Sequence, residues 1–288
     1  MRNIDEHTIT PAVLAQLQRC DNPRLQVLLS ALVQHLHDFM REVKLTEDEL
    51  MEGIRFLTAT GHKCDDRRQE FILLSDVLGL SMLAVAQNQK KAPGATESTV
   101  FGPFHVADAP RFNNGDDMAA GAPGEPLYVN CTVTGLDGEP VADAKVDVWQ
   151  ADDEGQYDVQ YADLPHPRAR GVFRTDAQGR FWFRSILPVA YPIPTDGPVG
   201  RLLVATGRHP WRPAHVHFMV EAPGYEPLIT HVFRDCDPYL DSDVVFGVRS
   251  SLMAPFARHE PGLTPDGGRS DQPFHTLNFD FRLQPRAS

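Results

Sequence analysis

The first third of the chain carries apolar residues at intervals of three and four, the spacing that gathers them on one face of a helix. The clearest stripe runs from Leu25 to Val43. Thr46 and Glu49 form a capping box, which predicts the start of another helix. A further run, residues 66–87, is apolar on nearly every side and predicts one continuous, buried helix. The first 90 residues show no strand pattern, so we expect a helical unit whose apolar face needs a partner surface.

A segment rich in lysine, alanine, proline and glycine, residues 90–95, separates this unit from a region with another pattern. Beyond it, short runs alternate apolar and polar residues, with turn pairs such as Asp137-Gly138 between them. Such alternation predicts strands, and many short strands with turns predict an antiparallel sandwich. The predicted strands are residues 127–133, 144–149, 180–186, 202–205, 215–220, 228–233 and 274–283. We therefore expect an α+β, mainly β chain, with an N-terminal helical domain over residues 1–95 and an antiparallel β-sandwich over residues 96–288.

Composition narrows the classes of partner. The chain has 39 acidic and 27 basic residues and a formal net charge of −12, which argues against nucleic acid or an anionic membrane as a general partner. No apolar run approaches the roughly 18 residues of a membrane span. The polar N-terminus does not resemble a signal peptide, and the four cysteines are far apart. We therefore expect reduced thiols and a cytoplasmic protein.

The first candidate metal-binding residues lie in the run from Arg212 to Val220, where His215 and His217 are two residues apart in a β-prone stretch. Side chains at i and i+2 of a strand point to the same face. The pair can therefore supply two neighbouring ligands to a metal. The alternative interpretation is two ordinary strand histidines.

Two tyrosines extend this hypothesis. Tyr191 lies in a stiff loop with three prolines, residues 187–194, and Tyr157 follows a predicted strand. Each alone is more often a packing residue. A phenol has a pKa near 10, so it ionises at neutral pH only beside a strong positive charge such as that of Fe³⁺. Zn²⁺ sites favour cysteine, histidine and carboxylate ligands instead. If a metal binds here, the residues favour ferric iron.

Over essentially its whole length, the chain resembles the intradiol ring-cleavage dioxygenases, the group of the catechol and hydroxyquinol 1,2-dioxygenases. The Arg-Pro-Ala-His-x-His block carries the resemblance, together with Tyr191, which lies 24 residues before His215. The resemblance implies one Fe³⁺ per subunit, held by Tyr157, Tyr191, His215, His217 and a water-derived hydroxide. It also implies that Arg212 stabilises negative charge on the substrate ring, and that Tyr191 leaves the metal and accepts a substrate proton.

Several stretches resemble the hydroxyquinol branch: residues 73–79, 98–104, 191–200 and 237–243. His231 stands where catechol-type enzymes usually carry a glutamine near the iron, so we expect it beside the ligands rather than among them. The implied reaction cleaves hydroxyquinol (1,2,4-trihydroxybenzene) with O₂ between the two adjacent hydroxyl-bearing carbons. The product would be 3-hydroxy-cis,cis-muconate or maleylacetate, in the catabolism of aromatic compounds.

The resemblance also implies a mostly apolar substrate pocket, as an aromatic ring requires. Asp76 stands out there as a carboxylate in an apolar stretch. It is either a helix-surface acid or an acceptor for the third hydroxyl, which would favour hydroxyquinol over catechol. The expected pocket residues are Leu73, Asp76, Val100, Phe101, Gly102, Pro103, Phe104, Ile193, Pro194, Arg212 and Val245.

Two other functions stay open from the residues. One is a catechol or chlorocatechol 1,2-dioxygenase, which would release a cis,cis-muconate. The other is a non-catalytic, transthyretin-like binding module, which would be colourless and metal-free. The family resemblance further implies a homodimer formed through the helical domain, with a phospholipid or fatty acid bound at that interface.

Overall fold

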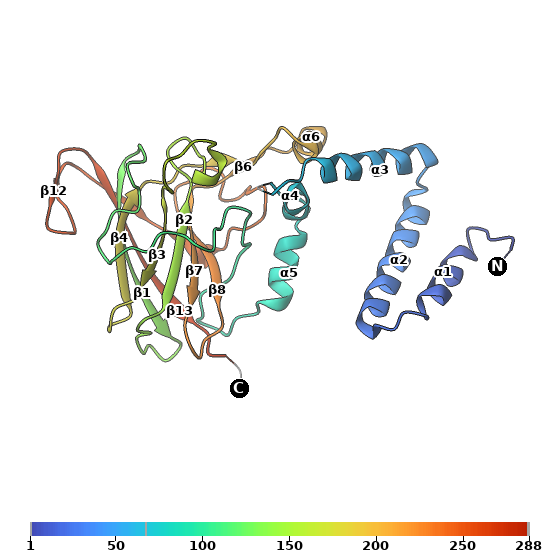
Figure 1. The fold of residues 1–288 in the computed structure, drawn as a ribbon, viewed down its shortest axis with the longest axis horizontal. Coiled ribbons are helices and arrows are strands. Elements are labelled where there is room, and N and C mark those ends of the chain that lie inside the picture. The colour runs from blue at the N-terminus through green and yellow to red at the C-terminus, as the bar shows by residue number, and fades with distance from the viewer. Residues whose placement is uncertain (1, 67, 287–288) are drawn as a thin grey trace. The chain divides into compact units, whose positions relative to one another are not determined.

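The computed structural model describes residues 2–66 and 68–286. It contains two compact units, the first ending at Ala59 and the second beginning at Thr60. Figure 1 draws the chain with its elements labelled. The two units are described in turn. The predicted domain boundary at residues 95 and 96 stays a prediction.

The first unit is helical, as its apolar spacing predicts. It holds α1 (Ile9–Leu17), α2 (Pro23–Val43) and most of α3 (Glu47–His62). The Asn22 side chain accepts a hydrogen bond from the Leu25 amide at 3.0 Å and so caps α2. The predicted capping box is present, because the Thr46 amide donates to Glu49 at 2.8 Å and the Glu49 amide donates back to the Thr46 hydroxyl.

The apolar stripe of α2 remains uncovered within this unit. Among the described residues none of α2 is buried. Its large apolar side chains are each about half exposed: Leu25, Leu28, Leu32, Leu36, Phe39 and Val43. A stripe of this kind on a monomer indicates an interaction surface.

The second unit begins with two helices where one was predicted. The continuous helix over residues 66–87 is wrong, because α4 (Glu70–Val77) and α5 (Leu80–Asn88) are separate and differ in direction by 74°. Gly79 lies between them at φ +75°, a left-handed conformation that glycine adopts without steric cost. In the described part of the chain, no single helix has the length and hydropathy to cross a membrane. The bent pair α4 and α5 meets these criteria when the two helices are taken together, by length and composition only.

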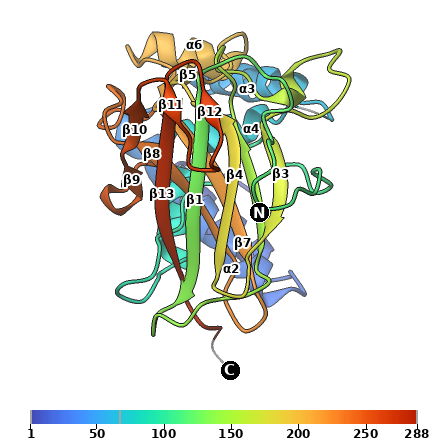
Figure 2. The ribbon, with the colours of Figure 1, turned by 90° about the vertical axis from the view of Figure 1, so that its left-hand side faces the viewer.

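Two sheets form the sandwich, so the predicted architecture is confirmed. Figure 2 shows the four-stranded layer facing the viewer, with β7 behind it. Its order is β10 (Phe256–His259), β13 (Phe274–Leu283), β1 (Pro126–Gly135), β4 (Arg180–Ile186). The five-stranded sheet has the order β3 (Arg170–Arg174), β2 (Lys145–Gln150), β7 (His215–Glu221), β8 (Leu228–Arg234), β9 (Met253–Ala254). Most neighbours are antiparallel, but β1 with β13 and β8 with β9 are parallel.

Shorter elements complete the unit. The predicted strand over residues 202–205 is wrong, because these residues belong to α6 (Pro198–Ala205), which has a proline in its first turn. β3 was not predicted. The other short elements are η1 (Asp158–Gln160), β5 (Tyr191–Pro192), β6 (Trp211–Arg212), η2 (Ser250–Leu252), β11 (Gly262–Leu263) and β12 (Arg269–Ser270).

One face of strand β7 packs into the core between the sheets, so the candidate site lies on its other face. Val216, Phe218 and Val220 of β7 pack into the core cluster shared by both sheets. Because side chains alternate along a strand, His215 and His217 project from the opposite face of the five-stranded sheet.

Candidate metal centre and active site

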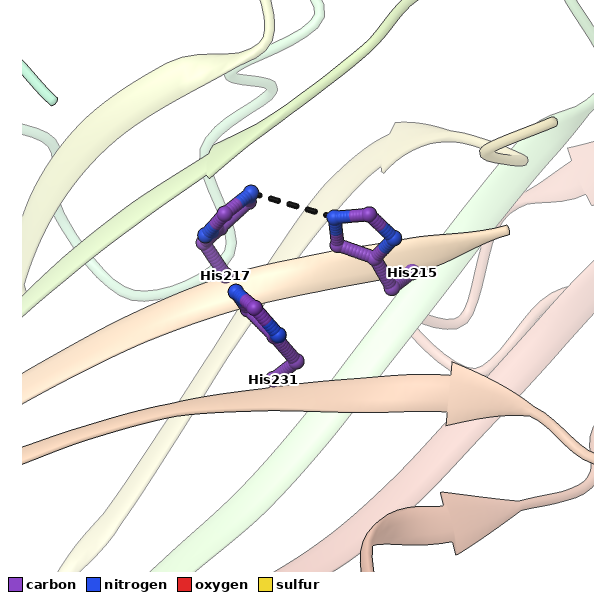
Figure 3. A group of neighbouring side chains, drawn as sticks. All are labelled: His215, His217 and His231. Atoms are coloured by element: carbon purple, nitrogen blue, oxygen red, sulfur yellow. Dashed lines mark hydrogen bonds between the residues drawn. The ribbon is translucent and has the colours of Figure 1, made fainter. Parts of the chain in front are cut away.

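The two histidines of β7 converge as the His-x-His pattern predicts. Their Nε2 atoms are 3.1 Å apart, and each residue is 1% exposed. Figure 3 shows both rings on one side of β7, with His231 on the neighbouring strand. The Nδ1–H of His215 donates to the Pro213 carbonyl at 2.7 Å. This bond fixes the tautomer that leaves the Nε2 lone pair free to face the cluster.

The two tyrosines meet the histidines at the same point. Tyr157 Oη lies 2.8 Å from His217 Nε2, 3.5 Å from His215 Nε2 and 3.1 Å from Tyr191 Oη. Donor atoms that bind a common ion at about 2.0–2.2 Å lie about 3 Å from one another. The structure therefore brings together all four side chains that the sequence predicted as ligands.

Local structure holds the loops that present the tyrosines. The Tyr157 amide donates to the Gln160 side chain at 2.8 Å. Tyr191 lies on β5, opposite Arg212 of β6. Gly155, at φ +77°, sits where the two loops touch, because a Cβ there would lie 2.7 Å from the Tyr191 Cβ. Only glycine allows this approach.

The electrostatics of the cluster fit a strongly charged cation. Burial lowers the pKa of His215 to about 3, with a further contribution from Arg212, so the imidazole is neutral at pH 7. Burial also lowers the pKa of His217 well below its usual range. Burial raises the pKa of Tyr157 well above 10, and Tyr191 raises it further. A metal with high charge would supply what the phenols need in order to ionise.

His231 adds a third imidazole. It pairs with His217 across β7 and β8, and their ring centroids are 4.1 Å apart in an edge-to-face contact. Ring nitrogens of His215, His217 and His231 all lie within 4.8 Å of one another. His231 Nδ1 is 2.9 Å from the Thr99 hydroxyl. Among the described residues, His231 Nε2 and His217 Nδ1 have no hydrogen-bond partner.

Arg212 lies at the histidine end of the cluster and is 4% exposed. Its Nη1 is 3.3 Å from His215 Nε2. Its Nε–H donates to Asp243 Oδ1 at 3.1 Å, and its Nη2 donates to Oδ2 at 3.3 Å. Burial lowers the pKa of Arg212, but Asp243 and Tyr191 raise it by more, so the guanidinium stays charged. Asp243 was not predicted as a site residue; its only signal is a carboxylate directly before two valines.

The predicted pocket residues lie around this cluster. A pocket of about 280 Å³ is lined in part by Leu73, Pro103, Phe104 and Pro194. The Phe104 ring stacks on Tyr157 with centroids 4.4 Å apart, so the pocket adjoins the donor atoms. The structure also describes larger hollows, of 510–630 Å³, and none of the four donor residues lines either these hollows or the 280 Å³ pocket.

Other expected pocket residues lie beside His217 or are enclosed. A Cβ at Gly102 would lie 3.3 Å from His217 Cε1. Phe101 is 40% exposed and packs edge-on against Trp149, which itself stacks on His217. Five expected pocket residues are buried without lining the 280 Å³ pocket: Asp76, Val100, Ile193, Arg212 and Val245.

Asp76, at the end of α4, is only 4% exposed, so the interpretation as a helix-surface acid is wrong. Burial raises the pKa of the Asp76 carboxyl above its usual value, and Asp243 adds to this effect. Ser81 and Arg212 lower the pKa but do not offset burial. These influences show that Asp76 lies within electrostatic reach of the pair formed by Arg212 and Asp243.

Comparison with known proteins agrees with this site. Residues 22–96 match the family model described as catechol dioxygenase N terminus, and residues 100–285 match the model described as dioxygenase. The 6-chlorohydroxyquinol 1,2-dioxygenase of Cupriavidus pinatubonensis is 58% identical over 99% of both chains. The structure of hydroxyquinol 1,2-dioxygenase from Pseudomonas putida DLL-E4 is similar with a TM-score of 0.90 at 47% identity, over 98% of this chain and 99% of that one.

A catechol-type structure is also similar, at lower identity. That of catechol 1,2-dioxygenase from Pseudomonas arvilla C-1 has a TM-score of 0.86 at 30% identity, over 100% of this chain and 94% of that one. Together with the buried histidine cluster, the matches indicate an enzyme with a metal cofactor. The chain belongs to the intradiol ring-cleavage dioxygenase family.

Proposed function

We propose that this chain is a hydroxyquinol 1,2-dioxygenase that uses one Fe³⁺ per subunit. The convergence of two phenol oxygens and two imidazole nitrogens at one buried point carries the proposal. The reaction adds both atoms of O₂ to hydroxyquinol and breaks the bond between its two adjacent hydroxyl-bearing carbons. The product is 3-hydroxy-cis,cis-muconate or its tautomer maleylacetate.

Tyr157, Tyr191, His215 and His217 would hold the iron, and His231 would pack beside them. A bound Fe³⁺ would supply the positive charge that lets the phenols ionise, and it would be a Lewis acid for the adjacent hydroxyl pair of the substrate. The neutral imidazoles contribute no negative charge, so the two phenolates balance most of the charge of the ion. This explains why both oxygen donors are tyrosines rather than weaker neutral ligands.

Protein groups supply the proton transfer and the charge stabilisation. Two phenolic protons must leave the substrate when it binds; Tyr191 Oη would accept one of them, and the water-derived hydroxide at the site would accept the other and leave as water. The stiff loop of residues 187–194 keeps that phenol close to the site after it is protonated. The Arg212 guanidinium is permanently charged and buried, so it stabilises negative charge that develops on the ring.

Asp76 gives the pocket its preference for a third hydroxyl. The apolar side chains hold the ring, and the Asp76 carboxylate accepts a hydrogen bond from the hydroxyl at ring position 4. A site built to pair a substrate hydroxyl disfavours the analogue that lacks it. The relatives support this choice, because two hydroxyquinol-type enzymes are 58% and 47% identical to the chain, whereas the catechol-type enzyme is 30% identical.

A substrate panel tests the proposal. Oxygen uptake by the iron-loaded protein is measured with hydroxyquinol, 6-chlorohydroxyquinol, catechol and chlorocatechols, and the products are identified by mass. We expect the highest kcat/KM for a trihydroxybenzene and a visible absorption band from tyrosinate-to-iron charge transfer. Zinc-substituted protein should be colourless and inactive. A preference for catechol would contradict the substrate, and an iron-replete protein with no visible band would contradict the ligand set.

The exposed stripe of α2 supports a homodimer formed through the helical domain. Its half-exposed side chains, from Leu25 to Val43, form a continuous apolar surface. A phospholipid or fatty acid at that interface would cover the part that protein does not. Mass spectrometry of organic extracts from the purified protein tests for the lipid. The cytoplasmic location remains a prediction.

A further inference from the structure

One buried carboxylate, Asp243, accounts for two of the three polar contacts that the structure gives the Arg212 side chain. Its two oxygens receive the Nε–H and one Nη2–H, at 3.1 and 3.3 Å. Both side chains are buried, at 4% and 2% exposure. The bonds therefore use the edge of the guanidinium formed by Nε and Nη2. The remaining group, Nη1, is left 3.3 Å from His215 Nε2.

The loop of residues 243–247 is folded around this carboxylate. The Val245 amide donates to Asp243 Oδ1 at 3.3 Å, and the Gly247 amide donates to Oδ2 at 2.9 Å. Between them, Phe246 is held at φ +60°, a conformation that bulky residues rarely adopt. Backbone amides thus hold the carboxylate from one side, and the guanidinium holds it from the other.

Arg208 anchors the same loop from outside. It donates to the Val244 carbonyl at 3.0 Å and to the Val77 carbonyl at 2.6 Å, and its guanidinium lies 5.1 Å from the centre of the Phe246 ring. Val77 ends α4, which carries Asp76. The loop is therefore tied to α4, and it has little freedom to follow Arg212 if that residue moves.

No space is left beside the pair. A Cβ at Gly247 would lie 3.1 Å from both Arg212 Nη2 and Asp243 Oδ2. Gly247 does not have a positive φ, so alanine is compatible with its backbone. A Gly247→Ala substitution therefore disturbs the geometry of the ion pair while keeping both charges.

We propose that Asp243 is a positioning residue that acts through Arg212. Together with the loop of residues 243–247, it keeps the guanidinium at the His215 end of the site, where charge develops on the ring. The inference rests on the proposed function, because it assumes that Arg212 stabilises that charge. Asp243 itself does not touch the substrate.

The test uses Asp243→Asn and Gly247→Ala in the iron-loaded protein, with Asp241→Asn, an exposed residue close by, as the control. Substrate is first bound without oxygen and followed by the visible band; oxygen is then added, and ring opening is followed in a single turnover. We expect unchanged iron content and substrate Kd within about 3-fold for all three variants. Ring opening should slow by about 10–100-fold for Asp243→Asn and by less for Gly247→Ala, because misplacing a catalytic group by about 1 Å has effects of this size.

A double-mutant cycle separates positioning from general damage. If Asp243 acts through Arg212, Arg212→Ala and Arg212→Ala with Asp243→Asn should open the ring at the same rate. Additive losses would overturn the proposal, as would a normal ring-opening rate in Asp243→Asn. If Asp243→Asn does not fold, the cycle is run with Gly247→Ala.

A second readout does not depend on turnover. In ¹⁵N-labelled protein loaded with diamagnetic Ga³⁺, the Arg212 Nε–H should exchange slowly with water, and it should exchange fast in Asp243→Asn but not in Asp241→Asn. Fast exchange in the unmodified protein would overturn the positioning role. If the unmodified protein opens no diol ring, the proposed function fails, and this readout still decides whether Asp243 holds Arg212.

Discussion

At the scale of single residues, the two histidines of β7 are oriented by different forces. His215 is held by a hydrogen bond from its Nδ1–H to the Pro213 carbonyl. His217 has no such bond among the described residues. Its ring is instead enclosed by Trp149, stacked 4.7 Å away, and by the edge of His231 at 4.1 Å. Aromatic packing therefore orients the His217 ring, whereas a hydrogen bond to a carbonyl orients the His215 ring.

Asp76 gives the first prediction at this scale. Asp76→Ala removes the proposed acceptor for the third hydroxyl, and the buried position leaves few other groups to replace it. We expect the ratio of kcat/KM for hydroxyquinol to that for catechol to fall about 100-fold or more. Steady-state oxygen uptake with both substrates measures the ratio. The control is Asp66→Asn, an exposed acid before α4; an unchanged ratio in Asp76→Ala would remove the proposed role.

His275 gives a prediction about pH. It is 2% exposed on β13. Burial lowers the pKa of its imidazole, and Arg234, Arg258 and His259 lower it further. Glu125 raises the pKa but does not offset these effects. Since the unfolded chain has a pKa near 6.5 there, it binds a proton that the folded chain does not. The contribution of His275 to the free energy of unfolding is therefore complete above about pH 6.5, and it falls as the pH decreases below that value.

Replacing this side chain should flatten that dependence. In His275→Gln, the free energy of unfolding should change less between pH 7 and 5 than in the unmodified protein, by up to about 1.4 kcal/mol per pH unit. Urea unfolding at several pH values measures the slope. His62→Gln, an exposed residue at the end of α3 that does not influence the pKa of His275, is the control. Identical slopes in His275→Gln and the unmodified protein would show that His275 is not involved.

The sequence patterns predicted some residues of the site more directly than others. Strand alternation alone predicted that His215 and His217 share a face, because both lie on one strand; it left open whether they bind a metal. Tyr157 and Tyr191 needed the family resemblance, since nothing local distinguishes a ligand tyrosine from a packing one. Asp243 was missed because its role depends on a tertiary contact with Arg212, 31 positions away.

At the scale of elements, the break between α4 and α5 decides where Asp76 lies. An unbroken helix would place that residue in mid-helix, whereas here it precedes the turn at Gly79 by three positions. The apolar periodicity runs through the break, so it could not reveal it. In the same way, the short apolar run at residues 202–205 fits a strand or a helix, and only the preceding proline favours the helix that forms.

Gly79→Ala tests the importance of this break. At φ +75° an alanine is strained, and its Cβ would also touch the Phe246 ring at 3.6 Å. We expect a loss of about 1–2 kcal/mol in the free energy of unfolding. Gly53→Ala in α3, where a Cβ meets nothing within 4 Å, should instead gain about 0.5–1 kcal/mol. Thermal melts of both variants measure this; a neutral Gly79→Ala would mean that the break does not need glycine.

At the scale of the whole molecule, the two units differ in how they use their apolar residues. The sandwich encloses one core between its sheets. The helical unit leaves the stripe of α2 about half exposed. The sequence predicted both features from periodicity, but periodicity shows only that a face is apolar. It does not show what covers the face.

The homodimer gives the prediction at this scale. Leu32→Asp places a charge in the middle of the stripe, where an apolar partner surface would have to bury it at a cost of several kcal/mol. Light scattering after gel filtration should show a dimer for the unmodified protein and a monomer for Leu32→Asp. Gln34→Lys, on the opposite side of α2, should remain dimeric. A Leu32→Asp protein that stays dimeric would place the interface elsewhere.

Strand β7 serves two purposes at alternate positions, and this limits how the protein can evolve. Val216, Phe218 and Val220 fill the core, while His215 and His217 face the cluster. An insertion or deletion of one residue in the strand would exchange these roles and would damage the fold and the chemistry in the same generation. Heritable change in substrate range is therefore expected to accumulate in the surrounding loops, while β7 keeps its length.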